Sequence, residues 1–254
     1  MSKQFTENTM PWYDDNHMWE IFYPCMFDED SFTLANQQCQ QILQLVAQPV
    51  ASVLDLACGP GRHVLGFARQ GLTVTGVDLS GFLLNQAANL IDQQGLDASL
   101  VQADLLAFQP QDSFDLITNL FTSFGYYPKP ADNQQVLNNA HRWLNPGGTL
   151  VIDTFGKEQA AHAIEPVHCT EYVNGDLRFE RPILINDMSV YANEWILVRG
   201  DQAHRWEYEH FVYSAHELTQ MLQTAGFQQV TIFGSLTGDD YDLTAERLVA
   251  VAHK

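Results

Sequence analysis

Positive charge is scarce in this chain of 254 residues, which has 12 Lys and Arg against 31 Asp and Glu and a formal net charge of −19. No run of basic residues interrupts that acidic background. A field of this sign repels the phosphate backbone of nucleic acids unless a local basic patch overcomes it. The composition therefore disfavours DNA and RNA as partners.

Other absences narrow the class of protein further. The four cysteines show no C-x-x-C spacing, and the nine histidines show neither H-x-x-x-H nor H-E-x-x-H. We therefore expect reduced thiols and no metal site. The first six residues are polar and unlike a signal peptide, and no apolar run is long enough to span a bilayer. These features predict a cytoplasmic protein with no membrane partner.

The chain has ample apolar residues for a core, since 46% of it is hydrophobic. Its length fits one large α/β domain or a domain with an insertion. The most informative stretch is 53–63, where an apolar strand enters a turn with Gly59, Pro60 and Gly61 and a helix then begins. Glycines let the backbone approach a ligand, and the first amides of a helix are unpaired. This arrangement predicts a site for an adenosine-containing ligand.

Two aspartates indicate which ligand that is. The dinucleotide fingerprint needs a third glycine where this chain has Val64, so the fingerprint fails. Asp55 lies inside the first strand, where its charge needs a partner such as an ammonium group. Asp78 follows the next expected strand, 72–77, and can accept both hydroxyls of a ribose. The site therefore calls for an amino group, a ribose and an adenine, and for no pyrophosphate.

Four segments in register resemble one family. Residues 55–61 (D-L-A-C-G-P-G), 77–80 and 103–105 resemble the class I S-adenosylmethionine-dependent methyltransferases, and 144–150 is similar to the turn before their fifth strand. The resemblance implies a Rossmann-like, doubly wound α/β fold. Its seven-stranded sheet would be mostly parallel, with one antiparallel strand. The implied cofactor is S-adenosylmethionine, which leaves as S-adenosylhomocysteine.

The resemblance also implies which residues bind the cofactor. Asp104 would accept a hydrogen bond from the adenine amine, Leu105 would lie near the ring, and Tyr13 is a candidate contact for the carboxylate. The expected cofactor residues are Tyr13, Asp55, Ala57, Gly59, Gly61, Arg62, Asp78, Leu79, Asp104, Leu105, Asn119, Leu120 and Phe121.

An aromatic loop, 121–127, follows the fourth expected strand at 114–120. Ring faces stabilise a cation such as a sulfonium and also shape an apolar pocket. The loop lacks the Asn/Asp-Pro-Pro-aromatic sequence of members that methylate amides or base amino groups, which argues against those substrates. The expected substrate-pocket residues are Trp12, Phe124, Tyr127 and Trp206. The candidates for a general base are Tyr126, Tyr208, His210 and His168, each of which could equally be a packed aromatic or a surface side chain.

Period-two alternation from about 168 to 214 predicts an antiparallel insertion of three or four strands over the carboxyl edge of the main sheet. Hairpin turns are expected at 174–175 and 200–201. The aromatic N-terminal segment is either a packed helix or a lid, and the next helix is expected to begin after an N-cap at Ser31. The expected organisation is an N-terminal segment at 1–30, a cofactor-binding core at 31–165, the insertion as a substrate cap at 166–213, and completion of the core sheet at 214–254.

The sequence thus predicts an S-adenosylmethionine-dependent methyltransferase that acts by in-line displacement on a small molecule, as a monomer or homodimer. One alternative is a non-catalytic regulatory module that binds S-adenosylmethionine or S-adenosylhomocysteine. Another is a nicotinamide-dependent oxidoreductase, against which Val64 already counts. The sequence leaves the methyl acceptor and its reacting atom open.

Overall fold

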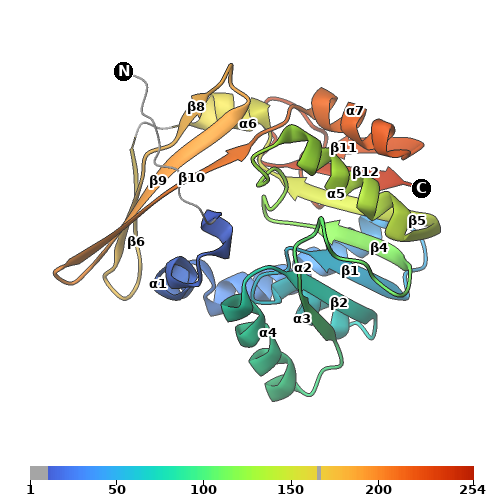
Figure 1. Cartoon of the computed structure of the whole chain (residues 1–254), viewed down its shortest axis with the longest axis horizontal. Helices are drawn as coiled ribbons and strands as arrows, with labels where there is room; N and C mark the ends of the chain where they lie inside the picture. The colour runs from blue at the N-terminus through green and yellow to red at the C-terminus, as the bar shows by residue number, and fades with distance from the viewer. Residues whose placement is uncertain (1–10, 165–166) are drawn as a thin grey trace.

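The structure, a computed structural model, describes residues 11–164 and 167–254 (Figure 1). The polar first six residues, which are not expected to form a signal peptide, lie outside these residues. The strands form two sheets, one of seven strands and one of five. Figure 1 shows the smaller sheet beside the edge of the larger sheet at which its parallel strands end.

The seven-stranded sheet has the strand order β11-β12-β5-β4-β1-β2-β3. β12 is antiparallel to both of its neighbours, and the other pairs are parallel. The predicted mostly parallel sheet with one antiparallel strand is therefore confirmed. Its strands are β1 (Ser52–Leu56), β2 (Thr73–Asp78), β3 (Ser99–Gln102), β4 (Phe114–Asn119), β5 (Leu144–Thr154), β11 (Gln229–Phe233) and β12 (Leu248–His253).

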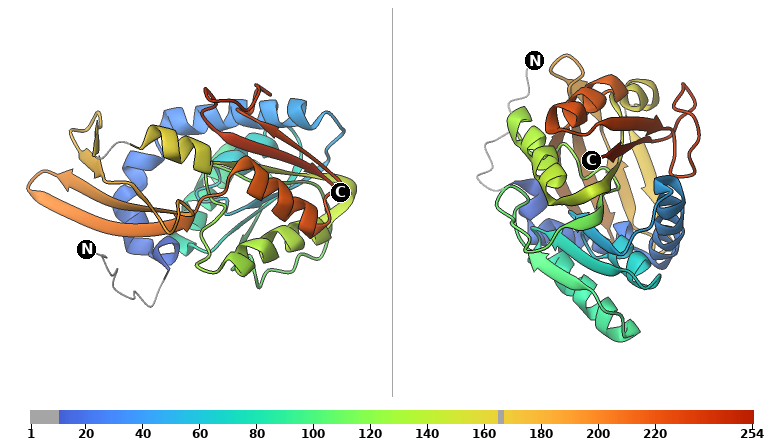
Figure 2. Two further views of the ribbon diagram at one scale, coloured as in Figure 1. Left: turned by 90° about the horizontal axis from the view of Figure 1, so that it is seen from above. Right: turned by 90° about the vertical axis from the view of Figure 1, so that its right-hand side faces the viewer.

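Helices cover both faces of this sheet (Figure 2). Alternation along β1 explains this, because Val53 and Leu54 point to opposite faces of the strand. Val53 belongs to one buried cluster and Leu54 to another, each formed with the helices on its side. The first side has α2 (Glu29–Val46), α3 (Arg62–Ala68) and α4 (Gly81–Gln94), and the second has α5 (Pro130–Trp143) and α7 (Ala215–Ala225).

Two predicted boundaries were wrong. Asp28, not Ser31, is the N-cap of α2, and its Oδ1 accepts a hydrogen bond from the Ser31 amide at 2.9 Å. The proline and glycines at 146–148 do not precede the fifth strand but lie inside β5. Leu144 pairs with Phe114 and the register then shifts, so these residues form an irregularity in the strand, which a positive φ at Gly147 permits.

The insertion has five strands rather than three or four, and all of its strand pairs are antiparallel. The extra strand arises because two short strands share β9: β8 pairs with its first half and β7 with its second half. Pro182 lies between them, where its missing N–H ends the ladder. Both predicted hairpin turns are confirmed. The strands are β6 (His168–Glu171), β7 (Leu177–Glu180), β8 (Ile183–Ile185), β9 (Val190–Arg199) and β10 (Gln202–Phe211), and α6 (Lys157–Ala163) precedes them.

The N-terminal segment joins the two sheets. It consists of a 3-10 turn, η1 (Trp12–Asp14), and α1 (Asn16–Met26). Asp15 caps α1, since its Oδ1 accepts hydrogen bonds from the first amides of the helix. Phe22 of α1 is fully buried in a cluster with Leu83 of α4 and Leu197 of β9. α1 thus packs against α4 and the insertion at the same time.

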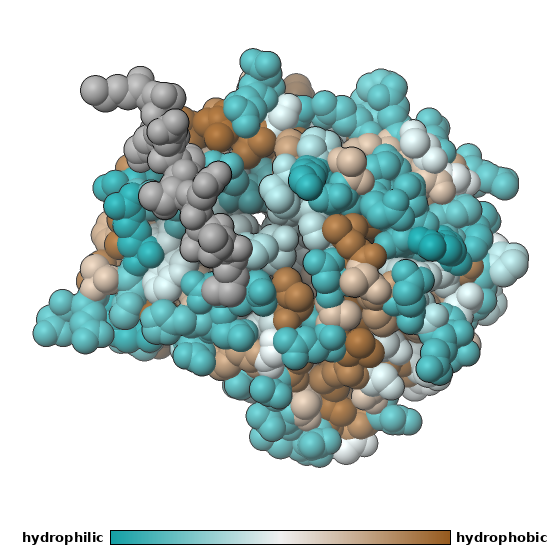
Figure 3. All heavy atoms as spheres, in the orientation of Figure 1, coloured by the Kyte–Doolittle hydropathy of each residue, from teal (hydrophilic) through white to brown (hydrophobic). Residues whose placement is uncertain are grey.

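The surface, the helices and the cysteines can be compared with what the composition predicts. Figure 3 shows mainly hydrophilic residues over the face that it presents. Among the described residues, no helix combines the length and the apolar character that crossing a bilayer requires. Cys25, Cys39 and Cys58 are buried, Cys169 is exposed, and all four are free thiols.

A close backbone contact ties the loop after β4 to the end of β10. The Phe211 amide donates to the Gly125 carbonyl at 2.8 Å, and Gly125 has φ +105°. A Cβ at Gly125 would lie 2.2 Å from the Phe211 carbonyl oxygen, a backbone atom that cannot move aside alone. Glycine is therefore required where the aromatic loop meets the insertion.

We expect Gly125→Ala to lower the free energy of unfolding by about 1–3 kcal/mol more than Gly95→Ala. Gly95 is the matched control, because its φ is also positive, at +61°, yet nothing lies within 4 Å of a Cβ there. Urea unfolding of the two variants measures the difference. Equal losses would contradict the proposed close packing of Gly125 on Phe211.

Candidate active site

A cavity of about 660 Å³ lies between the carboxyl edge of the main sheet, the N-terminal segment and the five-stranded sheet. This volume is within the range of about 300–1,000 Å³ that is typical of small-molecule pockets. The loops after β1, β2, β3 and β4 all contribute to its lining. Ligands of open α/β sheets bind at this edge, so the cavity lies where the sequence predicted a site.

The turn after β1 shapes the floor of the cavity. Ala57, Gly59 and Gly61 all have positive φ, between 54° and 77°. Ala57 and Gly59 line the cavity, but Gly61 does not. A Cβ at Gly61 would lie 2.9 Å from the Cβ of Ala87, so this glycine allows α3 to pack against α4. Gly61 thus contributes to the packing of the turn, and its expected contact with the cofactor stays a prediction.

Asp55 is the least satisfied acid of the site. Its Oδ1 accepts a hydrogen bond from the Thr118 hydroxyl at 2.7 Å, while its Oδ2 is buried with no partner. Burial, reinforced by the nearby Asp78, raises the pKa of Asp55 to about 7, although the hydrogen bond from Thr118 and the nearby Arg62 oppose the shift. A buried carboxylate without a partner is costly, so this atom is suited to a cationic ligand group.

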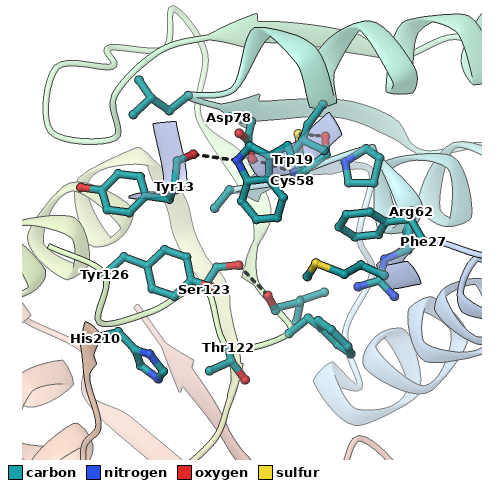
Figure 4. Close-up of a pocket in the computed structure, with 18 of the residues that line it drawn as sticks. Tyr13, Trp19, Phe27, Cys58, Arg62, Asp78, Thr122, Ser123, Tyr126 and His210 are labelled. Atoms are coloured by element: carbon teal, nitrogen blue, oxygen red, sulfur yellow. Dashed lines mark hydrogen bonds between the residues drawn. The ribbon is translucent and has the colours of Figure 1, made fainter. Parts of the chain in front are cut away.

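Asp78 connects β2 to the turn after β1. Its Oδ2 accepts from the Gly59 amide at 2.7 Å, and its Oδ1 accepts from the Ser80 amide at 2.8 Å. Burial raises the pKa of Asp78, and these amide hydrogen bonds oppose the rise. Each carboxylate oxygen keeps further acceptor capacity, because it can accept about two hydrogen bonds. Asp78 also lines the cavity, as Figure 4 shows.

Arg62 supplies positive charge on the opposite side of the cavity from Tyr126 (Figure 4). It is the first residue of α3 and is only 5% exposed. Its guanidinium lies 4.4 Å from the ring centre of Phe121 and 5.4 Å from that of Phe27. Burial lowers the pKa of Arg62, and the nearby acids, Asp55 first among them, oppose the shift. A guanidinium held by rings is free to bind a carboxylate.

Two tyrosines connect the N-terminal segment to the loop after β3. The Tyr127 hydroxyl donates to Asp104 Oδ1 at 2.7 Å, and the Leu106 amide donates to the same atom at 2.7 Å. Tyr13 lies edge-on to Tyr127 and stacks on Tyr126 with ring centres 5.6 Å apart. Burial and Asp104 raise the pKa of Tyr13 to about 12, so it keeps its proton at neutral pH.

His210 lies where the insertion meets the aromatic loop. Its ring centre is 5.8 Å from that of Tyr126 and 5.2 Å from that of Tyr191 (Figure 4). Both of its ring nitrogens are buried and have no hydrogen-bond partner. Burial lowers the pKa of His210 to about 4, so the imidazole is neutral at pH 7. Tyr208 stacks on it, and burial raises the pKa of that phenol. The site therefore contains a neutral imidazole with free hydrogen-bonding capacity.

The structure brings most of the predicted site residues to this one cavity. Those that line it are Trp12, Tyr13, Asp55, Ala57, Gly59, Arg62, Asp78, Leu79, Asp104, Leu105, Leu120, Phe121, Tyr126, Tyr127, Tyr208 and His210. Besides Gly61, the predicted residues that are not among the described lining residues are Asn119, Phe124, Trp206 and His168.

Three of these have structural roles instead. Asn119 donates from Nδ2 to the Leu56 carbonyl at 3.1 Å and joins β4 to β1. Phe124 is 3% exposed and packs in the core against Tyr213. Trp206 donates from Nε1 to Asp15 Oδ2 at 3.0 Å and so packs on the N-terminal segment. Protein neighbours thus contact all three side chains, while Asn119 Oδ1 is buried with no partner. Their assignment to the cofactor or the substrate stays a prediction.

Several residues that line the cavity were not predicted from the sequence. Tyr191 and Trp195 of β9 and Arg178 of β7 face the cavity from the insertion, and Phe27 faces it from the N-terminal segment. Period-two alternation of Tyr191, Asn193 and Trp195 could have identified the β9 face, as it did for β10. No group of three or more potential metal ligands occurs among the residues that the structure describes.

Comparisons with known proteins agree on one kind of enzyme. Residues 53–148 match the methyltransferase domain family. A Geobacillus sp. (strain WCH70) protein with a provisional methyltransferase name is 25% identical over 225 residues, which are 85% of this chain and 89% of that protein. A solved S-adenosylmethionine-dependent methyltransferase from Clostridium acetobutylicum is 17% identical with a TM-score of 0.75, covering 94% of this chain and 96% of its own.

A further neighbour was solved with cofactor. This is CalS10 from Micromonospora echinaspora, an S-adenosylmethionine-bound amino pentose methyltransferase of calicheamicin biosynthesis. It is 21% identical with a TM-score of 0.70, and the match covers 93% of this chain and 96% of that one. The solved neighbours share the fold of this chain, and the family match includes the turn after β1.

Proposed function

We propose that this chain is a class I S-adenosylmethionine-dependent methyltransferase, and that it methylates a small molecule held between the aromatic loop and the five-stranded sheet. The observation that carries the proposal is the buried, unpartnered Oδ2 of Asp55 at the carboxyl end of β1. The ammonium group of the cofactor would give this oxygen atom a cationic hydrogen-bond partner. The size of the cavity supports a small acceptor.

The residues present fit the groups of S-adenosylmethionine. We assign Asp55 to the ammonium, Arg62 to the carboxylate and Asp78 to the ribose hydroxyls, since each side chain offers the complementary charge or acceptor. Tyr13, in the same cavity, is a second candidate contact for the carboxylate. Asp104 Oδ1 is engaged by Tyr127, so Oδ2 is the atom that we assign to the adenine amine.

The walls position the acceptor and exclude water. When bound, the cofactor supplies an activated methyl group on a sulfonium. Tyr126 and Trp12, with ring centres 4.7 Å apart, present ring surface where a positive charge is favoured. Holding the reactants in line can lower the barrier by about 7–11 kcal/mol. Alignment is therefore the main contribution that we assign to this chain.

We assign His210 to the acceptor's nucleophile, as the hydrogen-bond acceptor that orients it. The low pKa of His210 keeps a lone pair on the ring across pH 6–8. Tyr126 and Tyr208 have raised pKa values, so in this assignment they act as protonated phenols that donate hydrogen bonds. The relatives and neighbours named above carry methyltransferase names, which gives the non-catalytic alternative no support.

We expect purified protein and methyl-labelled S-adenosylmethionine to convert one or more members of a small-molecule metabolite pool to products heavier by one methylene. Mass spectrometry of the pool measures the gain, and the label identifies the product. The same incubation with Asp78→Ala is the control, because the variant lacks the acid assigned to the ribose. Cofactor binding without transfer to any pool would contradict the proposal and favour the non-catalytic module.

A further inference from the structure

One face of the five-stranded sheet forms the wall of the cavity opposite the main sheet. In its ladders Tyr191 pairs with His210 and Glu180 pairs with Trp195. Paired residues lie on the same face of a sheet, and residues two apart along a strand share that face. Tyr191 and Trp195 therefore lie on the cavity face, four residues or about 13 Å apart along β9. The Tyr191 end is nearest the aromatic loop, because β10 meets Gly125 there.

Arg178 lies at the far end of this face. Its guanidinium is 5.2 Å from the ring centre of Trp195 and 5.7 Å from that of Tyr172, and all three residues line the cavity. Its Nη2 pairs with Glu180 Oε1 at 2.7 Å. Its Nε is buried with no partner. The guanidinium thus has one ionic partner while part of its donor set is unused.

Glu180 has further hydrogen-bond partners besides Arg178. Its Oε2 accepts hydrogen bonds from Trp195 Nε1 and from Asn193 Nδ2, both at 3.1 Å. The carboxylate is therefore held by three different side chains, and it fixes the position of Arg178. A positioned guanidinium with free donors, supported on two rings, is suited to a planar anion.

We propose that Arg178 binds a carboxylate on the methyl acceptor, and that the acceptor is a flat, elongated molecule. Its far end would carry the carboxylate at Arg178, and its nucleophile would lie beside His210. The rings of Tyr191, Tyr208 and Trp195 form the surface between these ends. This inference rests on the proposed function, since it assigns the acceptor of the same site. Arg178 is a specificity-determining residue here, and Glu180 is a positioning residue.

Three matched probes test the charge of the acceptor. They are 3-(4-hydroxyphenyl)propanoate, its amide and 4-(3-aminopropyl)phenol, which share a phenol and differ in the charge of the tail. Calorimetry on the protein saturated with S-adenosylhomocysteine measures their affinities. We expect the carboxylate to bind at least tenfold more tightly than the amide, and the amine to bind most weakly.

Variants test which residue is responsible for the preference for the carboxylate probe. The double variant Arg178→Gln/Glu180→Gln removes both charges and leaves neither buried alone, and it should bind the carboxylate and the amide equally. Arg178→Lys keeps a charge beside Glu180 and should retain part of the preference. Arg181→Gln is the matched control, because Arg181 pairs with Glu194 and is not among the described residues lining this cavity. It should keep the full preference.

Several results would overturn the inference. These are equal affinity for the carboxylate and the amide, preference for the amine, no measurable binding of any probe, or an unchanged preference in the double variant. Cofactor affinity is measured first for every protein. Intact cofactor binding with no carboxylate preference would overturn this inference alone, whereas absent cofactor binding in the unmodified protein would overturn the proposed function together with it.

Discussion

Asp78→Ala is expected to weaken S-adenosylmethionine binding at least hundredfold. Each hydrogen bond to a charged group contributes about 1.5–3 kcal/mol, and the variant loses two such bonds to the ribose. Together they correspond to a factor of about 10² to 10⁴ in the dissociation constant. The variant also loses the acceptors of the Gly59 and Ser80 amides, so the turn after β1 is less well ordered for the ligand. Isothermal titration calorimetry measures the change.

Two further variants serve as controls for the effect of Asp78→Ala on cofactor affinity. Asp92→Ala removes the same charge from an exposed position of α4 and should leave cofactor affinity unchanged. Asp78→Asn keeps one acceptor oxygen of similar shape and should give an intermediate loss. Circular dichroism and thermal unfolding establish that Asp78→Ala is folded. Affinity within threefold of the unmodified protein in folded Asp78→Ala would refute the ribose assignment.

Cofactor affinity is expected to depend on pH through Asp55, which is the second large effect. The pKa of Asp55 in the free protein is about 7 because the carboxyl is buried. An ammonium beside Oδ2 favours the ionised form, so binding must release the proton when the pH is below 7. Affinity should therefore rise about twentyfold between pH 5.5 and pH 7.5. Calorimetry at a series of pH values measures the slope.

Asp55→Asn should remove this pH dependence and bind the cofactor more weakly, by at least tenfold at pH 7.5, because an amide cannot pair with the ammonium as an ion. Asp78 and Arg62 also face Asp55, and both remain in the variant. A residual slope in Asp55→Asn would therefore report their contribution. An unchanged slope and affinity would show that Asp55 does not contact the ammonium.

The same substitution should have the opposite effect on the stability of the free protein. The pKa of Asp55 is raised above its unfolded value of 3.8, so the unfolded chain binds fewer protons between about pH 4 and pH 7. Stability is consequently lost across that window as the pH rises, and the loss is complete above about pH 7. Asp55→Asn carries no such charge and should unfold at a higher temperature at pH 7.5, although it binds cofactor worse.

The residues that we assign to the cofactor could be identified as candidates because each belongs to a recognisable local motif. Asp55, the turn glycines and Arg62 lie within one strand, turn and helix, and Asp78 ends the next strand. Local rules of backbone geometry and strand order bring such residues to one edge. The acceptor half differs in this respect. Arg178 and Trp195 meet only because β7 pairs with β9 in one particular register, and alternation alone does not specify the register of a strand pair.

Two predicted substrate residues that are not among the described lining residues illustrate the same limit of sequence patterns. Phe124 and Trp206 both belong to aromatic patterns that predict a buried face, and Phe124 is buried whereas Trp206 is only partly buried. Their neighbours come from other parts of the chain. Tyr213 packs against Phe124, and Asp15 of the N-terminal segment accepts a hydrogen bond from Trp206. Periodicity indicates that a face is covered but does not say whether protein or ligand covers it.

The five-stranded sheet leaves the main sheet after β5 and returns to it at α7. The segment between those two points contains neither β1, which carries Asp55, nor β2, which carries Asp78. This one continuous segment therefore supplies the wall that we assign to the acceptor, whereas the acids that we assign to the cofactor lie outside it. A laboratory graft at the same two crossings should carry acceptor preference from one homologue to another.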